Sequence, residues 1–267
     1  MHVDSYGKGS TAFVGIHGWA GNHRTFQPLK PCVPRDATLY SVDLPGYGRS
    51  KRPKQWTLTD VANDIVELLP TLSKKPVTLL GYCGGGNLAM LAAKHAPERV
   101  ARLVLLDPFA YMPLYFRVFT WGAFGRRAYM TTFGTSFGRR LTNTALSSKR
   151  TGKANLTSSF EKVDHAFILE VLRAFRDVQP CAYFGDLRMP IDLVYGRRSF
   201  GAVKHSVRLW QEIWPHARVI ELHGAGHSPL VEATEQLAQM VFADTPQGRV
   251  KTSTSKRPAR KRAKKRR

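Results

Sequence analysis

Short apolar runs alternate with segments of helical periodicity along most of this chain. The runs are rich in Val, Leu and Ile and show little polar alternation, as expected of strands that are covered on both faces. Repeated strand–helix units of this kind predict an α/β fold with a mostly parallel sheet and helices on both faces. The expected strands are 11–16, 38–42, 77–80, 100–106, 191–195 and 218–222.

Four helices are expected in the same core. The first begins after Thr57, a capping residue that has Asp60 three positions later, and its apolar residues recur at helical spacing up to Leu72. The other three are expected at 84–95, 203–214 and 231–242. Their alternation with the strands supports the strand–helix repeat.

One segment, 109–180, interrupts this repeat. It is far longer than the usual connection of about 2–6 residues. It opens with an aromatic-rich run, repeats Phe-Gly-Arg-Arg at 124–127 and 137–140, and closes with an expected helix at 159–178. Long ordered insertions are usually functional, so we interpret the segment as a lid; the alternative is a small helical subdomain that only packs. The predicted core therefore comprises 1–108 and 181–248.

Composition excludes several classes of protein. Apolar residues make up 43% of the chain, which excludes disorder of the whole. Three distant cysteines, Cys32, Cys83 and Cys181, do not make a disulfide scaffold and are expected to be free thiols in a reducing compartment. The start of the chain lacks a signal-peptide pattern, and no apolar stretch approaches the roughly 18 residues of a transmembrane segment. We therefore expect a cytoplasmic protein without a transmembrane segment.

The net charge of +22 is concentrated in part at the end of the chain. Residues 249–267 carry 11 basic side chains and no acidic one, so we expect a disordered basic tail. Such a tail would bind nucleic acid through phosphates without sequence specificity, or another polyanion such as an anionic membrane. Nucleoid or nuclear association, and a purely solubilising tail, are the alternatives.

Gly81-Tyr82-Cys83-Gly84-Gly85-Gly86 joins an expected strand directly to an expected helix. This is the context of a nucleophile elbow, a strained turn in which side chains two positions before and after the nucleophile would collide with backbone. The nucleophile position holds Cys83, at a helix N-terminus that favours a thiolate. The sequence therefore predicts a nucleophilic cysteine; the alternative is a buried structural cysteine.

Two loops at strand ends provide further candidates. His17-Gly18-Trp19 follows the first expected strand, and His17 is expected to orient this loop. His227 follows the last strand and can act as a general base, because its ordinary pKa lies close to working pH. His223, at the end of that strand, is its weaker competitor.

These elements in this order resemble the α/β-hydrolase superfamily over residues 11–243. The resemblance includes the stretch Asp43-Leu44-Pro45-Gly46-Tyr47-Gly48-Arg49-Ser50 and Glu232, five residues after His227. It implies the α/β-hydrolase fold, to which the inserted segment would add a helical lid, together with a nucleophile–histidine–acid triad and acyl chemistry. The superfamily places an oxyanion-hole N–H on the loop after the first strand, so the resemblance implies Trp19 and Gly84 as the two backbone donors. Asp43 is typically structural in such proteins, so it is not a candidate for the triad.

Two departures from the family pattern limit what can be carried over. Relatives usually place the triad acid three residues beyond the glycine that here is Gly196, and this chain has Ser199 there. Some members take the acid from the end of the preceding strand, which makes Asp107 the preferred candidate, unless it only caps that strand. The cysteine elbow resembles those of dienelactone hydrolases and polyhydroxyalkanoate synthases, whereas the other motifs resemble those of general esterases.

The sequence thus predicts an enzyme that hydrolyses a small-molecule ester or thioester through an acyl-enzyme on Cys83. The alternatives are an acyltransferase of the same fold and a catalytically inactive protein anchored to polyanions by its tail. Four lid residues are candidate substrate contacts, the arginines for an anionic group and the aromatic residues for an acyl chain, unless they are solvated helix faces. They are Arg126, Arg127, Tyr115 and Phe116. No metal site or organic cofactor motif is recognised, so none is expected.

Overall fold

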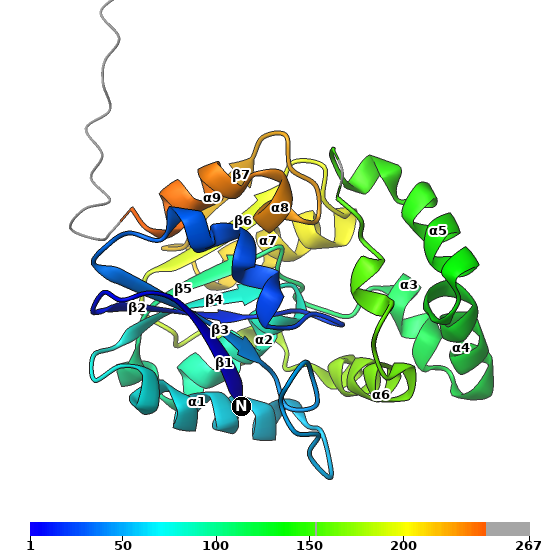
Figure 1. Cartoon of the computed structure of the whole chain (residues 1–267), viewed down its shortest axis with the longest axis horizontal. Coiled ribbons are helices and arrows are strands. Elements are labelled where there is room, and N and C mark those ends of the chain that lie inside the picture. Colours follow the sequence, from blue (N-terminus) through cyan, green and yellow to red (C-terminus); the bar gives the residue numbers. More distant parts are fainter. Residues whose placement is uncertain (153, 244–267) are drawn as a thin grey trace, which may run out of the picture.

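A seven-stranded sheet forms the centre of the protein, whose computed structural model describes residues 1–152 and 154–243 (Figure 1). The strand order is β1-β3-β2-β4-β5-β6-β7, and all neighbours pair in parallel except β1 and β3. The strands are β1 (His2–Gly7), β2 (Thr11–Ile16), β3 (Ala37–Asp43), β4 (Val77–Tyr82), β5 (Val100–Leu106), β6 (Ile191–Gly196) and β7 (Arg218–Leu222). The α/β-hydrolase fold expected from the sequence is confirmed, and the predicted basic tail at 249–267 lies outside the described residues.

The six expected strands are confirmed to within two residues at either end, but the edge strand β1 was not expected. Its sequence, His-Val-Asp-Ser-Tyr-Gly, contains a single aliphatic residue, and most of its side chains stay partly exposed. An antiparallel edge strand can be held by backbone hydrogen bonds without an apolar run. The periodicity argument therefore had no signal to detect there.

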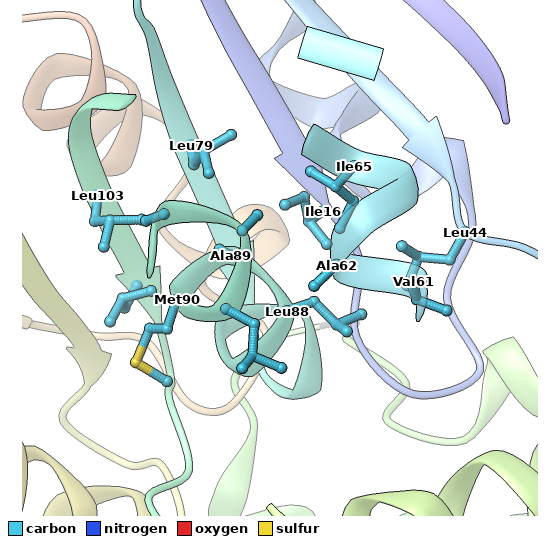
Figure 2. Packing of buried hydrophobic residues seen from close by; sticks show 14 of the residues in the cluster. Ile16, Leu44, Val61, Ala62, Ile65, Leu79, Leu88, Ala89, Met90 and Leu103 are labelled. Carbon is cyan, nitrogen blue, oxygen red and sulfur yellow. The ribbon is translucent and has the colours of Figure 1, made fainter. Parts of the chain in front are cut away.

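Alternating side chains of the central strands pack into two separate hydrophobic cores. Leu103 and Leu105 belong to one apolar cluster, while Val104 and Leu106 belong to the other. The first cluster is completed by α1 (Leu58–Leu72), α2 (Gly84–His95) and α7 (Gly201–Ile213), and part of it is shown in Figure 2. The second is completed by η1 (His23–Cys32) and α9 (Thr234–Val241). Figure 1 shows α1 and α9 on opposite sides of the sheet, so both faces are covered.

The helix predictions are confirmed for α1, α2 and α7 but need one correction near the end of the core. The Thr57 side chain accepts a hydrogen bond from Asp60 N at 3.0 Å, as expected of the N-cap of α1. The expected helix at 231–242 is instead two helices, α8 (Pro229–Glu232) and α9. They are separated at Ala233, whose φ of −140° is not helical. α8 ends at Glu232, and the carboxylate of this residue accepts hydrogen bonds from the loop that precedes α8.

The inserted segment forms a group of helices at one end of the sheet (Figure 1). They are α3 (Leu114–Arg117), α4 (Gly122–Tyr129), α5 (Ser136–Ala145) and α6 (His165–Ala174), joined by short 3-10 and π turns. The expected helix at 159–178 was too long at both ends. The Asp164 carboxylate caps α6 by accepting from Ala166 N and Phe167 N. Upstream of α6, Phe160 stacks on Phe133 with ring centroids 4.3 Å apart.

The Phe-Gly-Arg-Arg repeat marks two places where a helix approaches the preceding backbone closely. A Cβ on Gly125 would lie 2.5 Å from Val118 O, and one on Gly138 would lie 1.8 Å from Thr131 O. Only glycine permits these approaches, which explains the repeated glycine. Within the described residues, none of the helices has the length and apolar character that crossing a bilayer requires.

Candidate active site

Cys83 occupies a sharp turn between β4 and α2. Its φ of 53° lies in the left-handed region, where a residue other than glycine is strained. A Cβ on Gly81 would lie 2.6 Å from Gly86 Cα, and one on Gly85 would lie 2.2 Å from Ile16 O. The glycines therefore serve the steric purpose that the elbow hypothesis assigned to them.

His227 and Asp107 lie next to this turn, on the loops after β7 and β5. His227 Nδ1 is 2.7 Å from Asp107 Oδ2, across a sequence separation of 120 residues. Asp107 is fully buried, and its other oxygen accepts a hydrogen bond from Gly196 N at 3.0 Å. Like Cys83, Asp107 has a positive φ, of 48°. Three strand ends thus bring a thiol, an imidazole and a carboxylate together.

Ser199, at the position where relatives usually carry the acid, lies beside this pair. Its hydroxyl donates a short hydrogen bond to Asp107 Oδ2 and lies 3.4 Å from His227 Nδ1. The carboxylate from β5 therefore reaches the space that an acid after β6 would occupy, and a hydroxyl fills the remainder. The sequence marked Ser199 only as a missing acid, because a contact with Asp107 has no local signature.

The electrostatics of His227 follow from its two neighbours. Burial alone lowers its pKa, because burial disfavours the charged imidazolium. The Asp107 carboxylate and the Cys83 sulfur outweigh this effect and raise the pKa of His227 to about 10. Both neighbours therefore favour the charged form of the His227 ring.

The two residues expected to form the oxyanion hole line the same cavity. Trp19 and Gly84 both line a cavity against Cys83, and in the described part of the chain neither backbone N–H donates to a protein acceptor. A Cβ on Gly18 would lie 2.9 Å from Cys83 Cβ, so this loop packs directly on the elbow. The Trp19 indole donates to Ile168 O at 3.0 Å, which ties the loop to α6.

The two other histidines considered from the sequence have different positions. His17 is fully buried; its Nδ1–H donates to Gly18 O and its Nε2 accepts from Leu44 N. Burial lowers the pKa of His17 to about 4, so the ring is neutral and orients the loop. His223 is exposed, with its Nδ1 3.4 Å from Arg197, and lies outside the cluster.

Two cavities meet at Cys83. The larger, of about 280 Å³, is bordered by His227 and includes Arg24 in its lining. The smaller, of about 60 Å³, is almost entirely apolar. Its lining includes Gly84, Phe109, Met112, Leu172 and Phe175.

The four candidate substrate contacts lie at different distances from these cavities. Phe116 lines both of them. Tyr115 packs on Phe116, with ring centroids 4.8 Å apart, but lines neither. Arg126 and Arg127 are exposed on α4 and also line neither. Of the four, Phe116 is the one that lines these cavities.

Glu232 holds the loop that carries His227. Its carboxylate accepts hydrogen bonds from Gly226 N at 2.6 Å and Ser228 N at 3.2 Å, on either side of the histidine. It also accepts a short bond from Thr151 N, while His227 N donates to Lys149 O at 2.8 Å. One carboxylate thus joins the histidine loop to the inserted segment. The sequence showed only its spacing from His227, not this function.

We expect Glu232→Gln to loosen His227. The neutral amide accepts hydrogen bonds less strongly than the carboxylate and turns an NH2 group toward backbone donors. The free energy of unfolding should fall by about 1–3 kcal/mol, and turnover should fall by about tenfold because His227 is less well oriented. Denaturant unfolding and steady-state kinetics measure the two effects. Glu235→Gln, at an exposed position of α9, is the matched control; equal behaviour of both variants would contradict the positioning effect.

Comparisons with known proteins agree with this architecture. A model of the family described as the alpha/beta hydrolase fold matches residues 11–234. The chain is 26% identical over 258 residues to a pimeloyl-(acyl-carrier protein) methyl ester esterase from Pectobacterium carotovorum, covering 91% of this chain and 97% of that protein. It is 34% identical over 101 residues to a serine hydrolase-like protein from Danio rerio, which is 37% of this chain and 31% of that protein. The structure of a thermophilic esterase from Thermogutta terrifontis superposes with a TM-score of 0.73 at 17% identity, covering 90% of each chain.

Proposed function

The chain belongs to the α/β-hydrolase fold family, and from that premise we propose that it hydrolyses an ester or thioester through an acyl-enzyme on Cys83. The observation that carries the proposal is the meeting of Cys83, His227 and Asp107 at one point beside two cavities. A thiol at a strained elbow, a base next to it and a buried carboxylate behind the base are the components of nucleophilic acyl transfer. The similarity to an esterase over nearly its whole length supports ester hydrolysis.

In the first half of the proposed reaction, His227 takes the Cys83 proton and the sulfur attacks the substrate carbonyl carbon. The carbonyl oxygen becomes an oxyanion, which the N–H groups of Trp19 and Gly84 stabilise. The intermediate then collapses, the carbon–oxygen or carbon–sulfur bond to the leaving group breaks, and His227 protonates that leaving group. Asp107 stabilises the imidazolium throughout and holds its Nδ1–H.

In the second half, His227 removes a proton from water, and the resulting hydroxide attacks the thioester carbon. The carbon–sulfur bond to Cys83 breaks, the acid leaves, and the sulfur regains its proton from His227. If an alcohol took the place of water, the same steps would make a new ester. The acyltransferase alternative therefore differs only in the acceptor.

The two cavities suggest how a substrate lies. His227 must protonate the leaving group, and His227 borders the larger cavity, so the leaving group belongs there. The acyl group then occupies the small apolar cavity beside Gly84. Arg24 lines the larger cavity, so that cavity suits a polar or anionic leaving group. The expected substrate joins a short apolar acyl group to a bulkier polar alcohol or thiol.

The proposal is tested by mixing the protein briefly with a panel of acyl esters and thioesters and measuring both hydrolysis and intact mass. We expect turnover and a transient adduct with the mass of the acyl group. Product analysis with an added alcohol separates hydrolase from acyltransferase. Absence of adduct and turnover with every donor would contradict the proposal and favour the inactive binding protein.

Acyl-chain preference should depend on Phe175. Its ring closes the small cavity against the elbow, since a Cβ on Gly84 would lie 3.0 Å from Phe175 Cζ. Phe175→Ala should raise kcat/KM for octanoyl relative to acetyl esters by about tenfold or more, because a few added methylenes are accommodated. Phe137→Ala, at a ring that is 76% exposed, is the control. An unchanged ratio would place the acyl chain elsewhere.

A further inference from the structure

A second cluster of polar side chains lies at the sheet edge, outside the candidate active site. It consists of His2 and Asp4 on β1 and His23 at the start of η1. His2 Nε2 is 3.1 Å from Asp4 Oδ1, and His23 Nε2 is 3.6 Å from Asp4 Oδ2. All three candidate ligand atoms lie within 4.8 Å of one another.

The fold, not a sequence motif, brings these residues together. His2 and Asp4 are two positions apart on β1, so their side chains leave the same face of the strand. β1 pairs with β3 in a register that places His2 opposite Asp43. Asp43 in turn holds the start of η1, accepting from His23 N at 2.6 Å. No ligand spacing is visible in the chain, which explains why a metal site was not expected from the sequence.

The hydrogen bonds of His23 leave one ring nitrogen facing a carboxylate. His23 Nδ1 donates to Asp43 Oδ2 at 2.8 Å, and Asp43 is fully buried and also accepts from Arg49 N at 2.8 Å. A neutral His23 ring therefore has its lone pair on Nε2, where it faces an oxygen of Asp4. A proton or a metal cation between these two acceptors would stabilise both. A carboxylate behind a histidine is also the usual support of a metal-binding imidazole.

We propose that His2 Nε2, the Asp4 carboxylate and His23 Nε2 bind a zinc ion, with Asp43 orienting His23. Two nitrogens and one oxygen are ligands that Zn²⁺ prefers, and tetrahedral bonds of about 2.0–2.1 Å place ligand atoms about 3.3 Å apart. The 3.1 Å separation of His2 Nε2 from Asp4 Oδ1 lies close to that spacing, and His23 Nε2 faces the other oxygen of Asp4, Oδ2, at 3.6 Å. The side chains of His2 and Asp4 are 26% and 35% exposed, which leaves the fourth position open to water.

Arg49 brings a positive charge close to the proposed site. Arg49 Nη1 is 3.4 Å from His2 Nε2 and 4.0 Å from Asp4 Oδ1. Its side chain is 62% exposed, so it can turn into solvent when the ion binds. The ion would replace the guanidinium and join the edge strand to η1. A proton on either imidazole is the competing occupant of the same space.

The test uses the untagged full-length chain with Cys83→Ala, because the Cys83 thiol and His227 would also attract zinc. Zinc is titrated in competition with a chromophoric chelator, and one ion per chain is expected. His2→Ala and Asp4→Asn should each weaken its affinity by about 100-fold or more. His95→Ala is the matched control, since this exposed histidine hydrogen-bonds only to Asn63 among the contacts described.

Two further readouts do not depend on activity. Cobalt in place of zinc should give the absorption of a tetrahedral site without a thiolate charge-transfer band. Zinc should also raise the Tm, and His2→Ala should remove that rise. Binding that survives both His2→Ala and Asp4→Asn would overturn the proposal, as would a lack of stoichiometric binding. Because the host protein lacks Cys83, neither outcome depends on the proposed hydrolase function.

Discussion

Replacing Cys83 with alanine is expected to abolish the acyl-enzyme adduct and to lower kcat/KM for the best ester by about 10⁴-fold or more. The variant keeps the cavities and the oxyanion donors but has no atom that can bond to the acyl carbon. The side chain of Cys83 makes no capping hydrogen bond to α2, so alanine should not disturb the fold. Intact-mass spectrometry after brief mixing and initial-rate kinetics measure the two effects.

Controls for this experiment come from the chain itself. Cys181→Ala removes another thiol outside the site and should leave both the adduct and the rate unchanged. Cys83→Ser keeps a nucleophile at the elbow and should form an adduct that is an oxygen ester. Wild-type rates in Cys83→Ala would mean that another residue carries the chemistry.

Replacing His227 with glutamine is expected to lower kcat/KM by about 10²–10⁴-fold, the range that a general acid–base catalyst supplies. The same variant should alter the reactivity of the thiol. The pKa of His227 is raised to about 10, and a cationic ring beside a cysteine lowers the pH at which that cysteine reacts. Iodoacetamide should therefore alkylate Cys83 at lower pH in the wild type than in His227→Gln. His223→Gln, at an exposed position, should match the wild type.

The raised pKa also predicts how stability depends on pH. A histidine whose pKa is higher in the folded state than in the unfolded chain binds its proton more tightly when folded. Its contribution to the free energy of unfolding is therefore complete below about pH 6.5, the ordinary pKa of histidine. This contribution is lost as the pH rises toward about 10, the pKa of His227 in the folded protein. Urea unfolding of the wild type should show this decline relative to His227→Gln. If the free energy of unfolding depended on pH in the same way in both proteins, the pKa of His227 would not be raised by Asp107 and Cys83.

The residue that supplies the carboxylate beside His227 was only partly predictable from the sequence. The sequence showed that the usual position holds Ser199 and that Asp107 ends a strand. It left open whether Asp107 only caps that strand. The structure places the Asp107 carboxylate 2.7 Å from His227 Nδ1 and the Ser199 hydroxyl against both. Because β5 and β6 are neighbours in a parallel sheet, residues at their ends reach the same space.

Secondary structure was predictable where one local force dominates. The strands of the central sheet are continuous apolar runs, and α1 has a capping side chain and a helical apolar pattern, so their positions were expected. β1 has no such run and exists because β3 offers it backbone hydrogen bonds. The residues at the end of α8 and just before α6 contact residues far along the chain: Glu232 contacts Thr151, and Phe160 contacts Phe133. Periodicity carries no information about those contacts.

By itself, the sequence determined the order of the six parallel strands and of α1, α2 and α7, the elbow that holds Cys83, and the histidine loop after the last strand. Those features depend on residues within a few positions of one another, where sterics, capping and apolar spacing act. Only the tertiary structure decided which carboxylate meets His227, how Glu232 joins the histidine loop to the inserted segment, and that His2, Asp4 and His23 share one corner of the sheet. Each of these contacts joins side chains brought together by strand pairing and packing, and chain closure over such distances leaves no trace in local composition.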